Sequence, residues 1–269
     1  MEEIEIVSLS QAVGLLSSGE FATGQVVYRG VSDVERHTLI PSVGRIDPAI
    51  LCGMSIPKYE QETLERFKLR ANSEVSPQPR NDWEWLALAQ HHGMPTRLLD
   101  WTTSPLVALY FATKPAFDSR SRLLPCCRDG GAVYAMHTRE YLDVSCLVSP
   151  LDFEDHALFY PPHVTRRITG QFGVFSIQPD PTRKFEEGFC KGENRWITRL
   201  RFSAEVAKEI QRSLYLIGIR HETVFPDLDG FTYDLQVKFN LVECQMRDNR
   251  CDERAWDEGS KSRVLRMDT

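Results

Sequence analysis

Patterns typical of β-strands and of amphipathic helices follow one another along this 269-residue chain in no regular order. Short β-branched or apolar runs predict strands at residues 4–7, 25–30, 131–136, 170–177 and 196–202. Apolar residues repeating at three and four positions predict helices from residue 8 or 10 to 19, and at 58–73, 82–93, 104–112 and 203–218. A doubly wound parallel sheet needs strict alternation of strand and helix. The irregular order therefore predicts an α+β fold.

Local capping chemistry marks several helix boundaries. Asn81 or Asp82 begins one helix, and Gly93 follows its end, where a left-handed residue commonly stops a helix. Ser104 and Pro105 begin the next helix as cap and first helical residue. We find no internal repeat and no convincing linker, so we expect one domain over residues 1–244. Residues 245–269 are highly charged and poor in apolar groups, which predicts a loosely ordered tail.

The charge balance and the cysteines narrow the classes of function. A net charge of −6 disfavours a general nucleic-acid-binding protein, which needs clustered Lys and Arg. The 7 cysteines form no CxxC pair and no zinc-type spacing with histidine, so we expect free thiols and no metal site. The chain begins without a signal-peptide pattern and has no run long enough to span a membrane. We therefore expect a cytoplasmic protein without a membrane partner.

An arginine stands at the predicted end of an apolar strand, in Tyr28-Arg29-Gly30. A guanidinium in that position can bind phosphate or carboxylate, and Gly30 allows a sharp turn or the close approach of a ligand. The alternative is that Arg29 forms a structural ion pair. The motif alone leaves both open.

The segment at residues 89–104 combines two histidines, an arginine, an aspartate, a tryptophan and several hydroxyls between two predicted helices. Polar loops on a rigid scaffold often carry binding residues. The alternative is that Arg97 and Asp100 pair with each other, the hydroxyls cap helices and Trp101 fills the core. His91 and His92 are neighbours on a helix, about 100° apart, and so are poorly placed to share a metal ion.

These segments closely resemble the FRG domain, a prokaryotic family named for its Phe/Tyr-Arg-Gly motif. The resemblance extends over about residues 20–232. It rests on Tyr28-Arg29-Gly30, Leu39-Ile40-Pro41-Ser42 with Arg45, Ala89-Gln90-His91-His92-Gly93, Thr96-Arg97-Leu98-Leu99-Asp100-Trp101-Thr102, Ser104-Pro105-Leu106, Ala108-Leu109-Tyr110-Phe111-Ala112, Gln171-Phe172-Gly173-Val174-Phe175 and Phe225-Pro226-Asp227-Leu228-Asp229-Gly230.

A looser similarity links the chain to ADP-ribosyltransferases of the Arg-Ser-Glu type. Their aromatic-Arg-Gly motif corresponds to residues 28–30, their Ser-Thr-Ser-like strand to Thr102-Thr103-Ser104, and their catalytic-glutamate strand to the one that begins at Gln171. This similarity implies a central, mainly antiparallel split sheet flanked by helices. It also implies NAD as substrate or ligand, with Arg29 on phosphate, Tyr28 and Tyr110 on rings, and Thr103 and Ser104 near ribose or nicotinamide. Gly30, His92, Arg97, Thr102 and Phe111 complete the implied ligand site.

Gln171 departs from the pattern, because a neutral amide replaces the catalytic carboxylate. Three interpretations remain open. In the first, another carboxylate supplies the charge, and Asp100 is a better candidate than Glu154 or Glu186. In the second, the site binds a nucleotide without turnover. In the third, the similarity is one of fold alone. The resemblance thus predicts an NAD-binding ADP-ribosyltransferase or NAD glycohydrolase, acting as a toxin or phage-defence effector with a protein target or a cognate partner. The alternative is a non-catalytic nucleotide-sensing or protein-binding module.

Two further features have simpler expectations. Asp227 and Asp229 flank Leu228 beside Gly230, which suggests a turn more than a cation site. Thr165-Arg166-Arg167 suggests a solvated strand edge more than a site for a phosphate-bearing partner.

Overall fold

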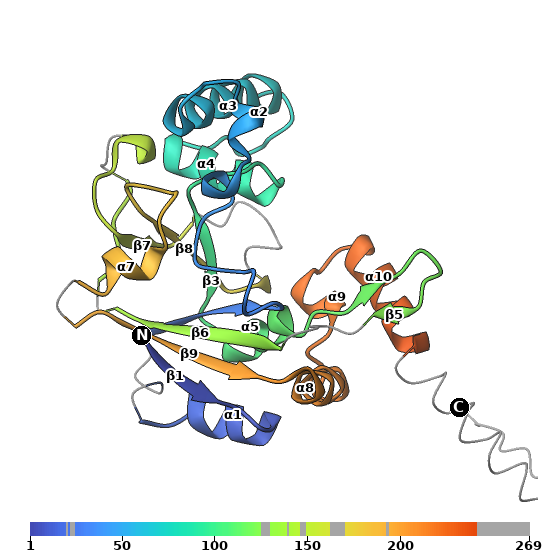
Figure 1. Cartoon of the computed structure of the whole chain (residues 1–269). Helices are drawn as coiled ribbons and strands as arrows, with labels where there is room; N and C mark the ends of the chain where they lie inside the picture. The colour runs from blue at the N-terminus through green and yellow to red at the C-terminus, as the bar shows by residue number, and fades with distance from the viewer. Residues whose placement is uncertain are drawn as a thin grey trace, which may run out of the picture.

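A seven-stranded mixed sheet forms the centre of the computed structural model, which describes residues 1–19, 21, 25–124, 130–138, 140–145, 149–161, 170–191 and 194–240 (Figure 1). The strand order is β1-β9-β6-β2-β3-β8-β7, and every neighbouring pair is antiparallel except the parallel pair β1 and β9. The strands are β1 (Glu2–Glu5), β2 (Val26–Val31), β3 (Leu99–Thr102), β6 (Gly131–His137), β7 (Ala157–Phe159), β8 (Gly173–Ile177) and β9 (Trp196–Phe202). A small second sheet pairs β4 (Ala116–Phe117) with β5 (Leu123–Leu124). The predicted α+β class, with a mainly antiparallel sheet, is confirmed.

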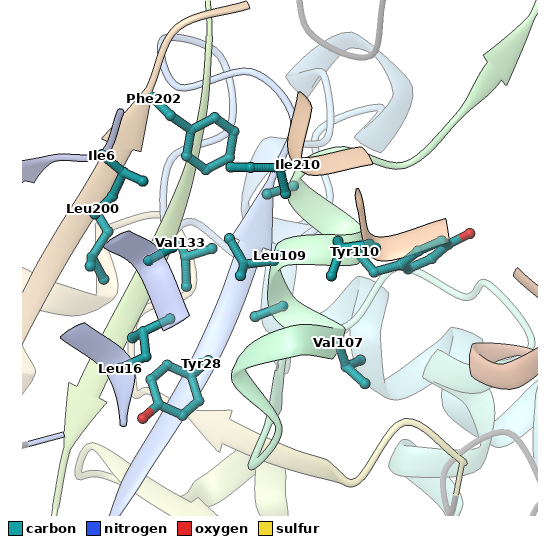
Figure 2. Close-up of a cluster of buried hydrophobic side chains, with 14 of the residues drawn as sticks. Ile6, Leu16, Tyr28, Val107, Leu109, Tyr110, Val133, Leu200, Phe202 and Ile210 are labelled. Atoms are coloured by element: carbon teal, nitrogen blue, oxygen red, sulfur yellow. The ribbon is translucent and has the colours of Figure 1, made fainter. Parts of the chain in front are cut away.

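Helices cover both faces of the sheet. On one face, α1 (Leu9–Leu16), α5 (Pro105–Ala112) and α8 (Ala204–Leu216) pack over β2, β6 and β9, and Figure 2 shows the apolar side chains between them. Beyond them on the same face, α3 (Ile56–Ala71) and α4 (Asp82–His91) pack over β7 and β8. The opposite face is covered by α7 (Phe185–Phe189). The remaining helical segments are α2 (Pro48–Leu51), α9 (His221–Val224), α10 (Leu228–Lys238), η2 (Val43–Arg45) and η3 (Pro150–Asp152).

Side-chain alternation along the strands explains this layering. In β2, Tyr28 points into the cluster beneath α5, whereas Val27 points into the cluster beneath α7. In β8, Phe175 and Ile177 contact the α3–α4 layer, and Val174 lies on the α7 side. The sheet is therefore buried on both faces. One face is shared by two separate groups of helices.

Among neighbouring strands of the sheet, β2 and β3 have the fewest paired residues. These strands pair through Tyr28 and Thr102 alone, whereas β2 and β6 pair along the whole of β2, from Val26 to Val31. The antiparallel register would next place Gly30 opposite Asp100, and that pair does not form. The two strands diverge at this point, which opens a gap in the middle of the sheet.

Several predicted elements are confirmed almost to the residue, and their caps explain why. Ser104 Oγ accepts a hydrogen bond from the Val107 amide at 3.4 Å at the start of α5, and Asn81 Oδ1 accepts one from the Glu84 amide at 3.0 Å at the start of α4. Gly93, after α4, has φ +85°. The strand predicted at 196–202 is β9, and the helix predicted from Ser203 is α8.

The strand predicted at 25–30 is β2, which extends to Val31. One sequence-based expectation is wrong. Residues 225–230 are not an isolated turn: Asp227 Oδ1 accepts a hydrogen bond from the Gly230 amide at 2.7 Å and so caps α10.

Some predictions concern residues outside the described part of the chain. These are the tail at 245–269, the segment Thr165-Arg166-Arg167 and five of the cysteines. The two cysteines within the described part, Cys52 and Cys190, are free thiols. None of the described helices combines the length and the apolar character needed to cross a bilayer. Among the described residues, we also find no group of three or more His, Cys, Asp or Glu side chains that could hold a metal ion.

Candidate functional site

A cavity of about 340 Å³ lies at the gap between β2 and β3. Helix α5 forms one side of the cavity and helix α4 forms the other, and strand β8 forms part of the floor. The lining residues are Tyr28, Arg29, Gly30, Gln90, His91, Asp100, Trp101, Thr102, Phe111, Gln171, Gly173, Val174, Phe175 and Phe225. The three segments that the sequence singled out, around residues 28–30, 100–111 and 171–175, therefore meet at one cavity.

Arg29 occupies the gap in the sheet. Its Nη1 donates a hydrogen bond to the Asp100 carbonyl oxygen at 2.6 Å, where the unformed pair with Gly30 leaves that oxygen without a strand partner. The same nitrogen lies 3.6 Å from Asp100 Oδ2. The Arg29 side chain is 21% exposed, and its Nε is buried without a hydrogen-bond partner among the described residues. Burial lowers the pKa of Arg29, and the nearby Asp100 carboxylate opposes that shift.

Asp100 is the one carboxylate among the described residues that line the cavity. Its Oδ2 accepts a hydrogen bond from Gln90 Nε2 at 3.0 Å, and the side chain remains 62% exposed. Gln90 Nε2 also donates a hydrogen bond to the Leu98 carbonyl oxygen at 3.3 Å, so the Gln90 side-chain amide bridges Leu98 and Asp100. The other two carboxylates considered from the sequence, Glu154 and Glu186, do not line the cavity.

Gly30 serves the packing of α5. A Cβ built at this position would lie 1.9 Å from the Ala108 carbonyl oxygen and 2.6 Å from the Ala112 amide nitrogen. The helix backbone thus contacts the strand directly, which only glycine permits. The close approach that was expected of a ligand is made by α5, and this approach brings Phe111 to the cavity.

The hydroxyl residues close the edge of the cavity. Thr102 Oγ1 donates to the Gln171 carbonyl oxygen at 2.7 Å and accepts from the Ser104 amide at 3.0 Å, so it fastens the end of β3 to the residues before β8. Gln171 reaches the cavity wall. Thr103 is exposed, and its amide donates to the Phe172 carbonyl oxygen at 3.1 Å. Thr103 and Ser104 do not line the cavity, and Ser104 caps α5 instead.

The two tyrosines expected to contact a ligand ring have buried side chains. Tyr28 forms part of the cavity wall, but its ring is 3% exposed and packs beside Leu16 in the apolar cluster of Figure 2. Burial raises the pKa of Tyr28 to about 12. Tyr110 is 4% exposed, does not line the cavity and hydrogen-bonds His221 Nδ1. Neither ring is therefore placed to stack on a ligand in this cavity.

His92 and Arg97 lie away from the cavity. His92 is exposed at the end of α4, whereas His91 lines the cavity. Arg97 is 2% exposed and pairs with Glu60, with Nη2 at 2.8 Å from Oε2, and its Nη1 donates to the Leu151 carbonyl oxygen at 3.1 Å. Arg97 therefore joins α3 to the strand-bearing part of the domain. The alternative pairing of Arg97 with Asp100 is wrong.

The sequence reasoning left Gln90, His91, Trp101 and Phe225 out of the predicted site. Gln90 and His91 stand in the last turn of α4, immediately before the predicted loop, so their place beside the polar segment was an available signal. Phe225 reaches the cavity from a segment that follows α9, and it packs against Phe111 with ring centroids 6.0 Å apart. No local sequence pattern predicts the contact between Phe225 and Phe111.

Comparison with protein families matches the FRG domain over residues 24–121. The matched segment contains β2, β3, α4 and α5, which carry most of the cavity wall. Comparisons with curated proteins and with solved structures found no match. The match ends before β6, so the resemblance noted at residues 171–175 and 225–230 remains a prediction. Residues 24–121 of this chain are an FRG domain.

Proposed function

We propose that the cavity between β2 and β3 binds NAD or a related nucleotide and cleaves its N-glycosidic bond, as an ADP-ribosyltransferase or NAD glycohydrolase. One observation carries the proposal: a partly buried guanidinium lines the cavity beside Asp100, the one carboxylate among the described lining residues, and its Nε has no hydrogen-bond partner among the described residues. The cavity also falls within the size range of small-molecule sites, about 300–1,000 Å³.

Arg29 is the phosphate-binding group in this proposal. A buried guanidinium nitrogen without a partner is costly, because it has lost water and gained no acceptor. A phosphate oxygen would supply that acceptor, and the planar guanidinium suits two parallel hydrogen bonds to phosphate. A bound anion would also offset the burial that lowers the pKa of Arg29.

Asp100 is the charge-stabilising group. When the N-glycosidic bond breaks, nicotinamide leaves with the bonding electron pair, and positive charge develops at the anomeric carbon. Water or an acceptor group then adds to that carbon and loses a proton. A carboxylate held in a fixed position favours this charge, and Gln90 holds Asp100 at 3.0 Å. Phe111 and Phe225 provide apolar walls for a flat ring.

Incubation of the purified protein with NAD tests the proposal through two measurements, nicotinamide release and the melting temperature. A bound ligand must stabilise the native state, so NAD should raise the melting temperature of the wild type. Arg29→Ala should abolish that rise, and Asp100→Asn should slow release by about 10²- to 10³-fold while NAD still binds. Arg66→Ala is the matched control, because Arg66 is exposed on α3 and pairs only with Glu62 in the described part of the chain. If NAD neither raises the melting temperature nor loses nicotinamide, the proposal is refuted.

A second candidate is a module that senses the same nucleotide without turnover. Two observations favour it. The Asp100 carboxylate is already engaged by Gln90 and Arg29, and Gln171 reaches the cavity as a neutral amide. A melting temperature that rises with NAD, without any nicotinamide release, would select this candidate.

The cellular role that we propose follows from the enzymatic one. An enzyme that consumes NAD in the cytoplasm would act as a toxin or a phage-defence effector, with a protein as one possible acceptor. Expression of the wild type in bacterial cells should then lower cellular NAD and slow growth, and Asp100→Asn should restore both. Unchanged NAD levels with the wild-type protein would argue against this role.

A further inference from the structure

A second cavity, of about 240 Å³, adjoins the first at Arg29. It shares Arg29, Gly30 and Phe111 with the first cavity. Its remaining polar wall comes from the segment between β2 and α2, through Ser32, His37, Thr38 and Arg45. Arg29 therefore borders two neighbouring cavities.

The second cavity carries an excess of positive charge. The Arg45 side chain has no hydrogen bond or ion pair in the part of the chain that the structure describes, whereas the Arg29 side chain is paired with Asp100. Asp33, an acid of the same segment, pairs with the exposed Arg36 at 3.6 Å. The charges of Arg45 and Arg29 reinforce the effect of burial in lowering the pKa of His37, against the influence of Asp33. Cations that repel one another around a cavity form a favourable site for an anion.

The segment that presents Arg45 is fixed to the domain on two sides. Ser42 Oγ accepts a hydrogen bond from the Thr96 amide at 3.0 Å, and the Val43 amide donates to the Thr96 carbonyl oxygen at 3.2 Å. On the other side, a Cβ on Gly44 would lie 1.7 Å from the Pro181 carbonyl oxygen, so the two backbones are in direct contact. Arg45 thus extends from a fixed backbone, which reduces the entropy lost when it binds a ligand.

We propose that the second cavity is an anion subsite, and that the ligand of the site is a diphosphate-containing nucleotide spanning both cavities. One phosphate would lie against Arg29 and the other against Arg45, with the hydroxyls of Ser32 and Thr38 as additional donors. This inference rests on the proposed nucleotide site and names its substrate class. A mononucleotide would fill the first cavity alone and leave Arg45 without a partner.

Calorimetric titration separates these ligand classes. The probes are ADP-ribose, AMP and inorganic diphosphate, at about 0.15 M salt so that distant charges are screened. Arg45→Ala should raise the dissociation constants of ADP-ribose and inorganic diphosphate by about tenfold or more, and should change that of AMP little. Arg36→Ala is the matched control: it removes the same charge from the same segment, its side chain is 82% exposed, and it does not line the cavity.

Two results would overturn the subsite. Either Arg45→Ala and Arg36→Ala shift the dissociation constants by the same factor, or Arg45→Ala weakens AMP as strongly as ADP-ribose. The same titrations distinguish a failure of the subsite proposal from a failure of the proposed function. Binding of inorganic diphosphate that depends on Arg45, without any binding of NAD, supports the subsite and refutes the function. Binding of NAD that depends on Arg29 and not on Arg45 supports the function and refutes the subsite.

Discussion

Replacement of Gly30 by alanine tests why the Tyr28-Arg29-Gly30 motif ends in glycine. The added Cβ would lie 1.9 Å from the Ala108 carbonyl oxygen, whereas real Cβ contacts under 3.0 Å essentially never occur. The strand and α5 would therefore have to separate by about 1 Å, the difference between these two distances. Neither backbone can move freely, because α5 is packed between the sheet and α8.

The expected loss of stability follows from that displacement. Overpacking in a core typically costs about 1–3 kcal/mol, and a clash of backbone with backbone belongs at the upper end. Alanine also restricts the unfolded chain more than glycine does, which offsets about 0.4–1 kcal/mol. We expect a net loss of about 2–3 kcal/mol. For a domain of this size that loss lowers the melting temperature by roughly 5–10 °C.

Thermal unfolding followed by circular dichroism measures this loss. Gly14→Ala is the control, because Gly14 is exposed in α1 and a Cβ there meets nothing within 4 Å. That substitution should leave the melting temperature unchanged or raise it, since alanine favours the helix by up to about 1 kcal/mol. A Gly30→Ala protein that melts within about 2 °C of the wild type would refute the packing argument. It would return Gly30 to a role in admitting ligand.

Three further substitutions test the assignments around the site. Glu60→Ala leaves the Arg97 guanidinium buried without its carboxylate partner. The free energy of unfolding, measured by denaturant unfolding, should therefore fall by about 3–5 kcal/mol. A decrease of less than about 1 kcal/mol would contradict the buried ion pair. Burial raises the pKa of the Glu186 carboxyl above its ordinary 4.5. The folded state therefore binds this proton more tightly than the unfolded state does. As a result, the wild type loses stability as the pH rises from about 4.5 through the raised pKa. Glu186→Gln lacks that loss, so its stability relative to the wild type should increase from pH 4 to pH 7, and a constant difference across that range would disprove the assignment. Tyr110→Phe removes the hydrogen bond to His221 and should cost about 1–3 kcal/mol, while nucleotide binding stays unchanged because Tyr110 lies outside the cavity; weaker binding would return Tyr110 to the site.

The elements that the sequence predicted well have local causes. Ser104 and Pro105 begin α5 because the cap and the proline act within one turn of chain. The alternation from residue 170 to 177 predicted two faces of a strand, and in β8 (Gly173–Ile177) Val174 lies on one face and Phe175 on the other. Such signals depend on neighbours a few residues away, so they can be read before the fold is known.

The elements that the sequence missed have mixed or weak patterns. In β3, Leu99 and Trp101 are buried but Asp100 is exposed at the cavity, so a four-residue strand resembled a polar loop. In α10, Asp227 and Gly230 suggested a turn, whereas the same residues form the cap and first turn of a helix. A glycine in a first helical turn gives little indication of the turns that follow it.

The sequence by itself determined the α+β class, the caps of the main helices and the three segments that meet at the cavity. The tertiary structure alone decided which partner each polar side chain found. Arg97 pairs with Glu60, 37 residues away, and Arg29 bonds Asp100, 71 residues away. The physical reason is that an arginine in a sequence shows its charge and its donors, but not the acceptor that folding brings within 3 Å. In this protein that choice places one arginine in the core and the other at the cavity, where its buried Nε has no hydrogen-bond partner among the described residues.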